Sequence, residues 1–165
     1  MKNHSGKWLR SAFLVLLAAF CQVAAADFSG KVVGVSDGDT LSVMRRGTAV
    51  KVRIAGIDAP ERNQPWGQQS KQALASTVFG RTVEIDQRKK DRYGRTLGRV
   101  LIGGEDVGLQ LIRKGFAWHY RQYARDQPAT EAQQYAHAEK QARAHRAGLW
   151  RDAHPIPPWN WRRKH

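Results

Sequence analysis

Residues 32–54 read VVGVSDGDTLSVMRRGTAVKVRI, and this stretch decides the fold class. Apolar and polar residues alternate through its last part, which has the two-residue period of a half-buried β-strand. The tetrapeptide Arg45-Arg46-Gly47-Thr48 has the composition of a hairpin turn. The stretch therefore predicts three strands, around residues 32–35, 41–43 and 50–54.

Helices are predicted after the third and the fifth strand. Leu74 and Val78 recur at helical spacing within residues 68–79, and Gly80 is suited to end that helix. Asp106 is suited to cap a second, short helix that closes at Gly115. The remaining predicted elements are a strand around 83–85, a polar loop at 88–96 and a strand at 100–102. This order predicts an α+β fold, in which a five-stranded OB-fold β-barrel carries about three helices.

The end of the chain has two parts. Residues 130–147 are predicted to form an amphipathic helix, with Thr130 and Gln133 as a capping box and Gly148 just beyond its end. Residues 153–165 are rich in Pro and Trp and carry Arg162, Arg163 and Lys164 just before the last residue. We expect them to form an extended basic tail outside the catalytic residues.

The first 26 residues are typical of a secretory signal peptide. A positive segment precedes an apolar run, and Ala24-Ala25-Ala26 offers small residues for cleavage. The apolar run is short for a membrane anchor, and Phe20 argues against a lipoprotein site at Cys21. We therefore expect a secreted or periplasmic protein. Cleavage would remove Cys21, the one cysteine in the sequence, which excludes thiol catalysis and cysteine-bound zinc in the mature chain.

The composition is strongly basic. The sequence has 28 Lys and Arg against 14 Asp and Glu, a formal net charge of +14. Such a surface favours a polyanion as partner, and Trp and Tyr residues among the cations favour nucleic acid. We expect a monomer without stable membrane insertion of the mature chain.

Carboxylates concentrate in two short segments. Asp37 and Asp39 lie two residues apart around Gly38, so both can face one cation such as Ca²⁺ or Mg²⁺. An ordinary Asp-Gly turn between strands is the alternative. The second segment places Asp58 and Glu61 directly after a strand that bears Arg53. Phosphoryl chemistry needs an arginine that binds the phosphate, a carboxylate that binds a metal and a second carboxylate that accepts a proton.

A basic segment follows at residues 88–95. Its sequence, RKKDRYGR, is typical of a solvated face. In a nuclease it would lie against the substrate backbone, and Arg95 after flexible Gly94 could reach the charge that develops on phosphorus.

These motifs together resemble those of the thermonuclease, or staphylococcal-nuclease-like, family. The resemblance covers about residues 29–150 and includes the Asp37-Gly38-Asp39-Thr40 segment, then Arg53, then the Asp58 and Glu61 segment, then the segment from Asp91 to Arg95. It implies an OB-fold nuclease domain at 27–152 that uses Ca²⁺ to hydrolyse DNA and RNA, leaving a 3′-phosphate and a 5′-hydroxyl.

The resemblance also implies residue roles. Asp39, Asp58 and the Ala59 carbonyl would bind Ca²⁺, with Asp37 near or linked through water. Glu61 would be the general base, and Arg53 and Arg95 would bind the scissile phosphate. The expected substrate contacts are Lys89, Lys90, Arg92, Tyr93, Tyr120 and Tyr123.

Two readings from other classes remain. A non-catalytic OB or nuclease-like module would bind nucleic acid without cleaving it, but such modules typically lack one or more of the acids and arginines present here. A cationic protein that binds the cell envelope would explain charge and export, but not the ordered carboxylates.

Overall fold

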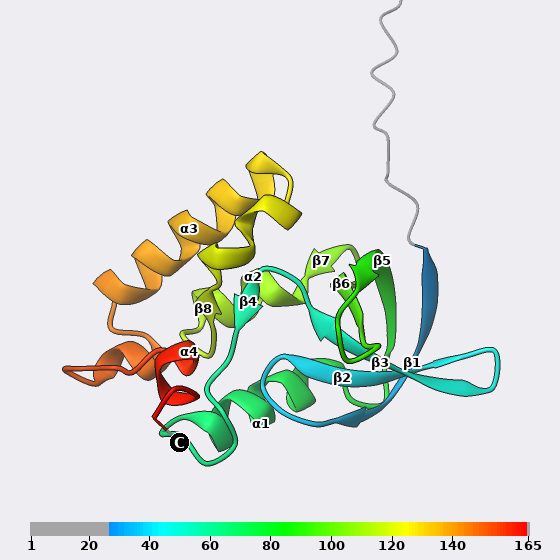
Figure 1. Cartoon of the computed structure of the whole chain (residues 1–165), viewed down its shortest axis with the longest axis horizontal. Coiled ribbons are helices and arrows are strands. Elements are labelled where there is room, and N and C mark those ends of the chain that lie inside the picture. The colour runs from blue at the N-terminus through cyan, green and yellow to red at the C-terminus, as the bar shows by residue number, and fades with distance from the viewer. Residues whose placement is uncertain (1–26, 165) are drawn as a thin grey trace, which may run out of the picture.

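Five strands close into a barrel in the computed structural model, which describes residues 27–164 apart from the side chains of 123–125 (Figure 1). The barrel strands are β1 (Phe28–Val35), β2 (Thr40–Arg45), β3 (Thr48–Ile54), β5 (Thr82–Lys90) and β6 (Thr96–Ile102). Four of the strand pairings are antiparallel, and a parallel pairing of β3 with β6 completes the circle. The predicted α+β class and five-stranded OB-type barrel are confirmed. The predicted signal peptide lies outside the described residues.

The β2–β3 hairpin forms where the sequence predicts it. Arg45 pairs with Thr48, and the two residues between them, Arg46 and Gly47, have φ angles of 48° and 81°. Two successive left-handed residues make the tight turn whose twist matches that of the strands. The hairpin register places Thr40 opposite Arg53, which brings the first acidic segment beside the end of β3.

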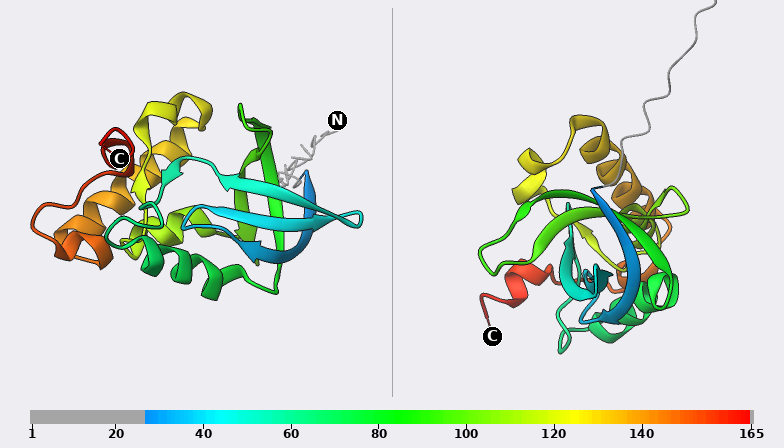
Figure 2. Two further views of the ribbon diagram at one scale, coloured as in Figure 1. Left: turned by 60° about the horizontal axis from the view of Figure 1, so that its bottom comes forward. Right: turned by 90° about the vertical axis from the view of Figure 1, so that its right-hand side faces the viewer.

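Three longer helices cover the barrel: α1 (Gly67–Val78), α2 (Val107–Arg113) and α3 (Ala129–Ala144). Side chains from barrel and helices share one core, which includes the fully buried Leu41, Ile54, Leu74, Ile85 and Leu111. Each such side chain stabilises the fold by roughly 1.5–3 kcal/mol relative to exposure. Helix α1 packs beside β1, and α2 lies between the barrel and α3 (Figure 2).

Short elements connect these parts. They are β4 (Ile57–Asp58), β7 (Glu105–Asp106), β8 (Trp118–His119), the 3₁₀-helices at Arg121–Asp126 and Gly148–Arg151, and α4 (Pro158–Trp161). Asp106 caps α2 as predicted, because its carboxylate accepts a hydrogen bond from the Leu109 N–H at 2.9 Å.

Three sequence predictions for local structure were wrong. Residues 88–90 belong to β5 rather than to a loop, because that strand continues past a bulge and pairs Lys90 with Thr96. Helix α3 has no capping box: it begins at Ala129 behind Pro128, and no side chain caps it. It also ends at Ala144, because Arg146 adopts a φ of 51° before Gly148 is reached.

The C-terminal segment is folded against the domain and includes a helix, which corrects the expected extended tail. Its chain follows the 3₁₀-helix that ends at Arg151, passes the turn that precedes α1 and forms α4 beside β4 and β8 (Figure 1). Gln64 donates a hydrogen bond to the Ile156 carbonyl at 2.6 Å, and Trp66 donates one to Asp152 at 2.9 Å. These contacts place residues 158–162 at the end of the barrel that carries the acidic segments.

Candidate active site

The first acidic loop is held by a close backbone approach at Gly38. A Cβ atom on Gly38 would lie 2.7 Å from the Cβ atoms of both Ala59 and Ser70, so only glycine fits between them. Asp37 accepts a hydrogen bond from the Asp39 N–H at 3.2 Å. The packing therefore fixes where the two carboxylates leave the backbone.

Asp39 is buried, with 6% of the residue exposed, and accepts hydrogen bonds on both oxygens. Thr40 donates to Oδ1 at 2.9 Å. The backbone N–H of Ala59 donates to Oδ2 at 3.1 Å, which joins the first acidic segment to the second. Thr40 thus supports the loop that carries Asp39.

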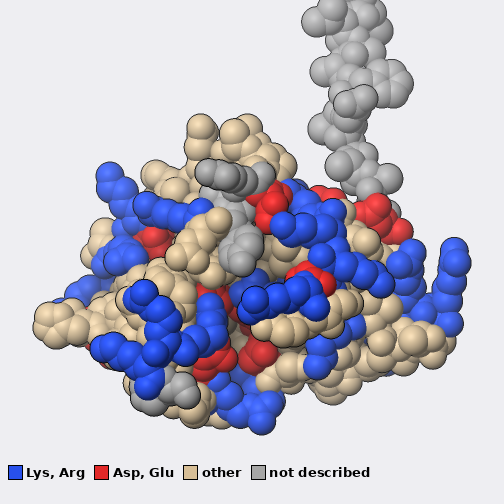
Figure 3. All heavy atoms as spheres, in the orientation of Figure 1, with Lys and Arg blue, Asp and Glu red and all other residues tan. Residues whose placement is uncertain are grey.

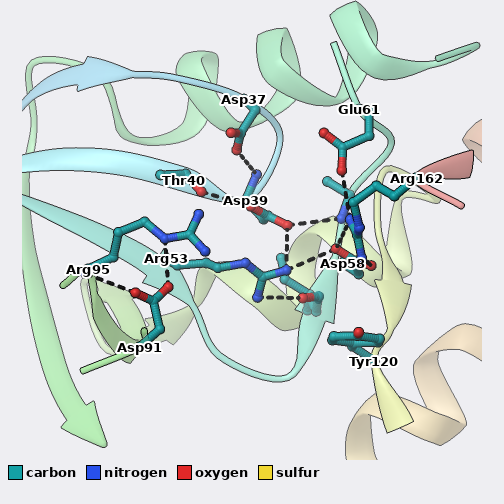
Figure 4. A network of polar contacts seen from close by, with 12 residues as sticks. Asp37, Asp39, Thr40, Arg53, Asp58, Glu61, Asp91, Arg95, Tyr120 and Arg162 are labelled. Carbon is teal, nitrogen blue, oxygen red and sulfur yellow. Dashed lines mark hydrogen bonds and ion pairs between the residues drawn. The ribbon is translucent and has the colours of Figure 1, made fainter. Parts of the chain in front are cut away.

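Arg53 joins Asp39 to Asp58. Its Nη2 lies 3.2 Å from Asp39 Oδ2 and 2.9 Å from Asp58 Oδ1, and its Nη1 donates to the Ile57 carbonyl at 3.3 Å (Figure 4). One oxygen of each carboxylate therefore faces a common point. Strand β3 delivers the arginine, while the β4–β8 pairing of Asp58 with Trp118 fixes the second carboxylate.

The carboxylates repel one another and are removed from water, and their pKa values reflect both effects. Burial, with the charge of Asp39, raises the pKa of Asp37 to about 6. Burial also raises the pKa of Asp58 to about 6, despite a hydrogen bond from Arg162. Burial acts in the same direction on Asp39, but the Arg53 charge and the Ala59 N–H hold its pKa below 3.8. A cation beside these carboxylates would favour their charged forms.

Glu61 lies beside this group on the more exposed rim. Its backbone N–H donates to Gln64 Oε1 at 3.1 Å, and its side chain is 36% exposed. Gly67 supports the same turn, because a Cβ atom there would lie 1.8 Å from the Glu61 carbonyl oxygen. Glu61 therefore combines a fixed backbone with a carboxylate open to water.

Arg162 is a residue of this site that sequence reasoning missed. Its guanidinium donates to Asp58 Oδ2 at 2.8 Å, to Asp58 Oδ1 at 3.3 Å and to Glu61 Oε1 at 2.7 Å (Figure 4). The sequence offered one signal, the basic end of a Trp-rich tail, but nothing local indicates that this arginine returns to the acidic segments.

Arg95 lies in the β5–β6 loop and is held by Asp91. Its Nε donates to Asp91 Oδ2 at 2.7 Å, and its backbone N–H donates to Asp91 Oδ1 at 3.0 Å. Burial raises the pKa of Asp91, but these hydrogen bonds outweigh burial and hold that pKa below 3.8. In Figure 4 the side chain lies on the Arg53 side of the network, whereas Arg162 lies on the Asp58 side.

The predicted substrate contacts on β5 and its loop are spread over the surface. Lys89 forms an ion pair with Asp126, and Lys90 is exposed. Tyr93 is 67% exposed, and the guanidinium of Arg92 lies 4.8 Å from its ring centroid. The ion pair of Lys89 and the ring contact of Arg92 thus involve residues outside the acidic centre.

Tyr120 lies on the other side of the site. Its backbone N–H donates to the Gly56 carbonyl at 2.9 Å, and its ring stacks on Trp159 of α4 with centroids 5.4 Å apart. Tyr123 belongs to the 3₁₀-helix at Arg121–Asp126, and its side chain lies outside the described part of the structure. An open cleft of about 730 Å³ starts at Tyr120 and Trp159. Its cationic lining residues are Arg121, Lys140 and Arg143.

Charge on this face has a clear pattern. In Figure 3, acidic side chains gather near the centre of the face and Lys and Arg surround them. The surrounding cations give this face a positive field that attracts a polyanion.

Within residues 27–164, no group of three or more His, Cys, Asp and Glu side chains is gathered as a metal cage in this conformation. The guanidinium groups of Arg53 and Arg162 lie among the carboxylates instead. The predicted Ala59 carbonyl ligand stays a prediction, as do the roles of the other site residues. None of the helices described here is long and apolar enough to cross a bilayer.

An OB-type barrel that carries carboxylates and arginines at one end places the chain in the class of staphylococcal-nuclease-like α+β folds. The family model described as staphylococcal nuclease homologue matches residues 51–152. The chain is 38% identical to Protein ParB of Escherichia coli, over 99% of this chain and 96% of that protein. It is 43% identical to an uncharacterized endonuclease of Escherichia coli O157:H7, over 92% and 95%. It is 39% identical to a micrococcal nuclease of Shigella flexneri, over 94% and 92%.

The chain belongs to the staphylococcal nuclease family. The resemblance stated from the sequence motifs is thereby confirmed. The family and the names of these relatives support nuclease activity, and hence a nucleic-acid substrate.

Proposed function

We propose that this protein is an exported, Ca²⁺-dependent endonuclease that hydrolyses DNA and RNA with little sequence preference and leaves 3′-phosphates. One observation carries the proposal: Asp39 Oδ2 and Asp58 Oδ1 converge on a single nitrogen of Arg53, with Glu61 beside them. Phosphodiester hydrolysis needs carboxylates that bind a metal, a guanidinium group that binds the phosphate and a solvent-accessible carboxylate that takes a proton, and this site brings all three together.

The donor set fits Ca²⁺. Asp39 and Asp58 supply hard carboxylate oxygens. Ala59 directly follows Asp58, and Asp37 lies two residues before Asp39, so the Ala59 carbonyl and the Asp37 carboxylate would complete the site. Burial raises the pKa of Asp58 and of Asp37 to about 6 and so disfavours their charged forms, which a bound cation would stabilise. Bound Ca²⁺ would supply Lewis-acid stabilisation of charge on the phosphate oxygens.

The chain's own residues account for the other parts of the reaction. Glu61 takes a proton from the attacking water, whose oxygen forms a bond to phosphorus. Arg53 and Arg95 hold the phosphate oxygens and stabilise the charge of the pentavalent transition state. The bond from phosphorus to the 5′ oxygen then breaks, the 5′ oxygen takes up a proton from water, and the phosphate stays on the 3′ end.

Substrate binding is supported by the charge pattern and the cleft. The cleft beside Tyr120 offers aromatic rings and the cations Arg121, Lys140 and Arg143 to a nucleic-acid strand that leaves the acidic centre. Contacts of this kind recognise phosphates and base faces rather than base edges, which fits weak sequence preference. We propose that the protein acts as a monomer in the periplasm or outside the cell.

A direct test uses plasmid DNA and a single-stranded RNA, each with Ca²⁺ or with EDTA. We expect cleavage with Ca²⁺ only, and 3′ ends that a polymerase extends only after phosphatase treatment. Cleavage in EDTA, or full activity with Mg²⁺ alone, would contradict the Ca²⁺ assignment. Binding without any cleavage would indicate the non-catalytic nucleic-acid-binding module.

Asp39→Asn is the matched variant for this test. The amide keeps the shape of a side chain that accepts three hydrogen bonds, but it removes the charge that binds a cation. We expect turnover to be lost at ordinary Ca²⁺ concentrations while the fold is retained by circular dichroism. Asp86→Asn on β5 is the control, and it should keep wild-type turnover.

A further inference from the structure

The C-terminal segment places a cation on the two carboxylates that the proposed mechanism uses most directly. Arg162 binds both oxygens of Asp58, at 2.8 and 3.3 Å, and one oxygen of Glu61 at 2.7 Å. The Asp58 side chain is 1% exposed, whereas that of Arg162 is 42% exposed. The guanidinium thus lies at the entrance to a buried carboxylate. The arginine lies beyond residues 51–152, which the family model matches.

The segment that carries Arg162 is anchored at several points. Trp159 packs on Trp118 with ring centroids 5.6 Å apart and stacks on Tyr120 at 5.4 Å. Farther back, the Ile156 carbonyl and the Asp152 carboxylate accept hydrogen bonds from residues just before α1. The arginine therefore starts from a fixed helix, α4, and its position does not depend on the ion pairs alone.

Arg162 competes with a metal ion for the oxygens of Asp58. Asp58 Oδ1 already receives Arg53 and Arg162, and Oδ2 receives Arg162. A divalent cation on Asp58 needs one of these oxygens, and it would then face the charge of Arg162 in addition to that of Arg53, in a partly buried site. Coulomb repulsion there is several-fold larger than in water. Arg162 on Asp58 therefore opposes the binding of a metal ion there.

We propose that Arg162 is an intramolecular competitor for the divalent-cation site: it holds Asp58 and Glu61 when no metal is bound and must leave Asp58 before metal can bind. The inference rests on the proposed Ca²⁺ site. In the metal-free protein the guanidinium offsets the negative charge of the carboxylates. The apparent metal affinity is then the intrinsic affinity multiplied by the fraction of molecules in which Arg162 has left Asp58. Arg162 thereby sets the Ca²⁺ concentration at which the enzyme becomes active.

Calorimetric titration of Ca²⁺ into the metal-free protein tests this directly. Arg162→Ala should bind Ca²⁺ at least about fivefold more tightly than the wild type, within the usual 5–150-fold range for coupling between two ligands. Arg163→Ala is the matched control: it removes the same charge one residue later, where the side chain contacts Asn160 rather than the carboxylates. Its Ca²⁺ affinity should stay close to that of the wild type.

Arg162→Lys separates occupancy from net charge. Lysine keeps the charge but cannot bind both oxygens of Asp58 as a planar fork, so its Ca²⁺ affinity should move toward that of Arg162→Ala. A lysine variant identical to the wild type would show that only net charge matters and would overturn the proposal. Arg162→Gln repeats the test if the alanine variant does not fold.

The outcomes distinguish this inference from the proposed function. Equal or weaker Ca²⁺ binding by Arg162→Ala, with Ca²⁺-dependent cleavage intact, overturns the competitor role alone. Absence of Ca²⁺ binding in the wild type and in every variant overturns the proposed Ca²⁺ site, and the competitor role with it.

Discussion

Gly38 packs against Ser70 so closely that a Cβ atom added to the glycine would lie 2.7 Å from the serine Cβ. The same added atom would meet the Ala59 Cβ at 2.7 Å. The loop that carries Asp37 and Asp39 is thus clamped between helix α1 and the segment that carries Asp58. The first two acidic motifs of the sequence lie close together because this glycine lets their backbones approach.

Gly38→Ala should therefore separate the two acidic segments. An overpacked site of this kind costs about 1–3 kcal/mol of unfolding free energy, and we expect Ca²⁺ affinity and cleavage to fall as well. Urea unfolding and calorimetric Ca²⁺ titration measure the two effects. Gly34→Ala is the control, since a Cβ atom there has only ordinary contacts, the nearest 3.7 Å away on Ser42. Wild-type Ca²⁺ affinity in Gly38→Ala would contradict the clamp.

Glu61→Gln should separate binding from cleavage. Glutamine keeps the size of the side chain but cannot take the proton of the attacking water, so kcat should fall by roughly 10²–10⁴-fold. Nucleic-acid affinity should stay the same or rise slightly, because one negative charge near the phosphate is removed. Single-turnover cleavage of a short single-stranded DNA, beside a binding assay with Ca²⁺, gives both quantities. Glu84→Gln, an exposed change on β5, should leave both unchanged, and near wild-type cleavage by Glu61→Gln would reject the assigned base.

The pair Arg95 and Asp91 predicts a graded loss of turnover. Arg95→Lys should lower kcat strongly, because a point charge cannot replace a planar fork on two phosphate oxygens. Asp91→Asn should lower kcat less, since it leaves Arg95 in place and weakens the ion pair at 2.7 Å that orients it. Cleavage rates at saturating substrate measure the order. A larger loss in Asp91→Asn than in Arg95→Lys would show that Asp91 has a role other than orienting Arg95.

His119 predicts a pH-dependent part of stability. The residue is 4% exposed, and burial lowers its pKa below 6.5, although Gln127 and Glu139 act in the opposite direction and only Arg121 assists. The unfolded chain then binds more protons than the folded one as pH falls below 6.5, so this contribution is complete above that pH and is lost below it. Each unit of pKa depression corresponds to about 1.4 kcal/mol.

His119→Gln tests this sign by comparison with the wild type. The amide can still donate to Gln127, but it does not titrate, so the wild type should lose unfolding free energy relative to the variant as pH falls from about 8 to about 5. The exposed change His137→Gln is the control and should follow the wild-type curve. A constant difference between wild type and His119→Gln across this range would refute the prediction.

Local patterns predicted most of the barrel. The alternation that ends at Ile54 and the Arg46-Gly47 turn specify a hairpin, because the strand period and a left-handed turn are properties of neighbouring residues. The same reliance on neighbouring residues predicted the wrong start for helix α3. Thr130 and Gln133 have capping chemistry, but Pro128 and the packing of α3 on α2 set where the helix begins.

The sequence by itself determined the α+β barrel and the acid and arginine motifs, since each depends on residues that lie close together along the chain. Only the tertiary structure decided how these groups meet. Arg53 reaches Asp39 through the β2–β3 register, and Asp58 is fixed by pairing with Trp118. Arg162 reaches Asp58 across 104 positions of sequence, because packing of Trp159 on Tyr120 returns the chain to the site. Such a contact leaves no period or spacing in the sequence, because it depends on the summed path of every element between the two residues.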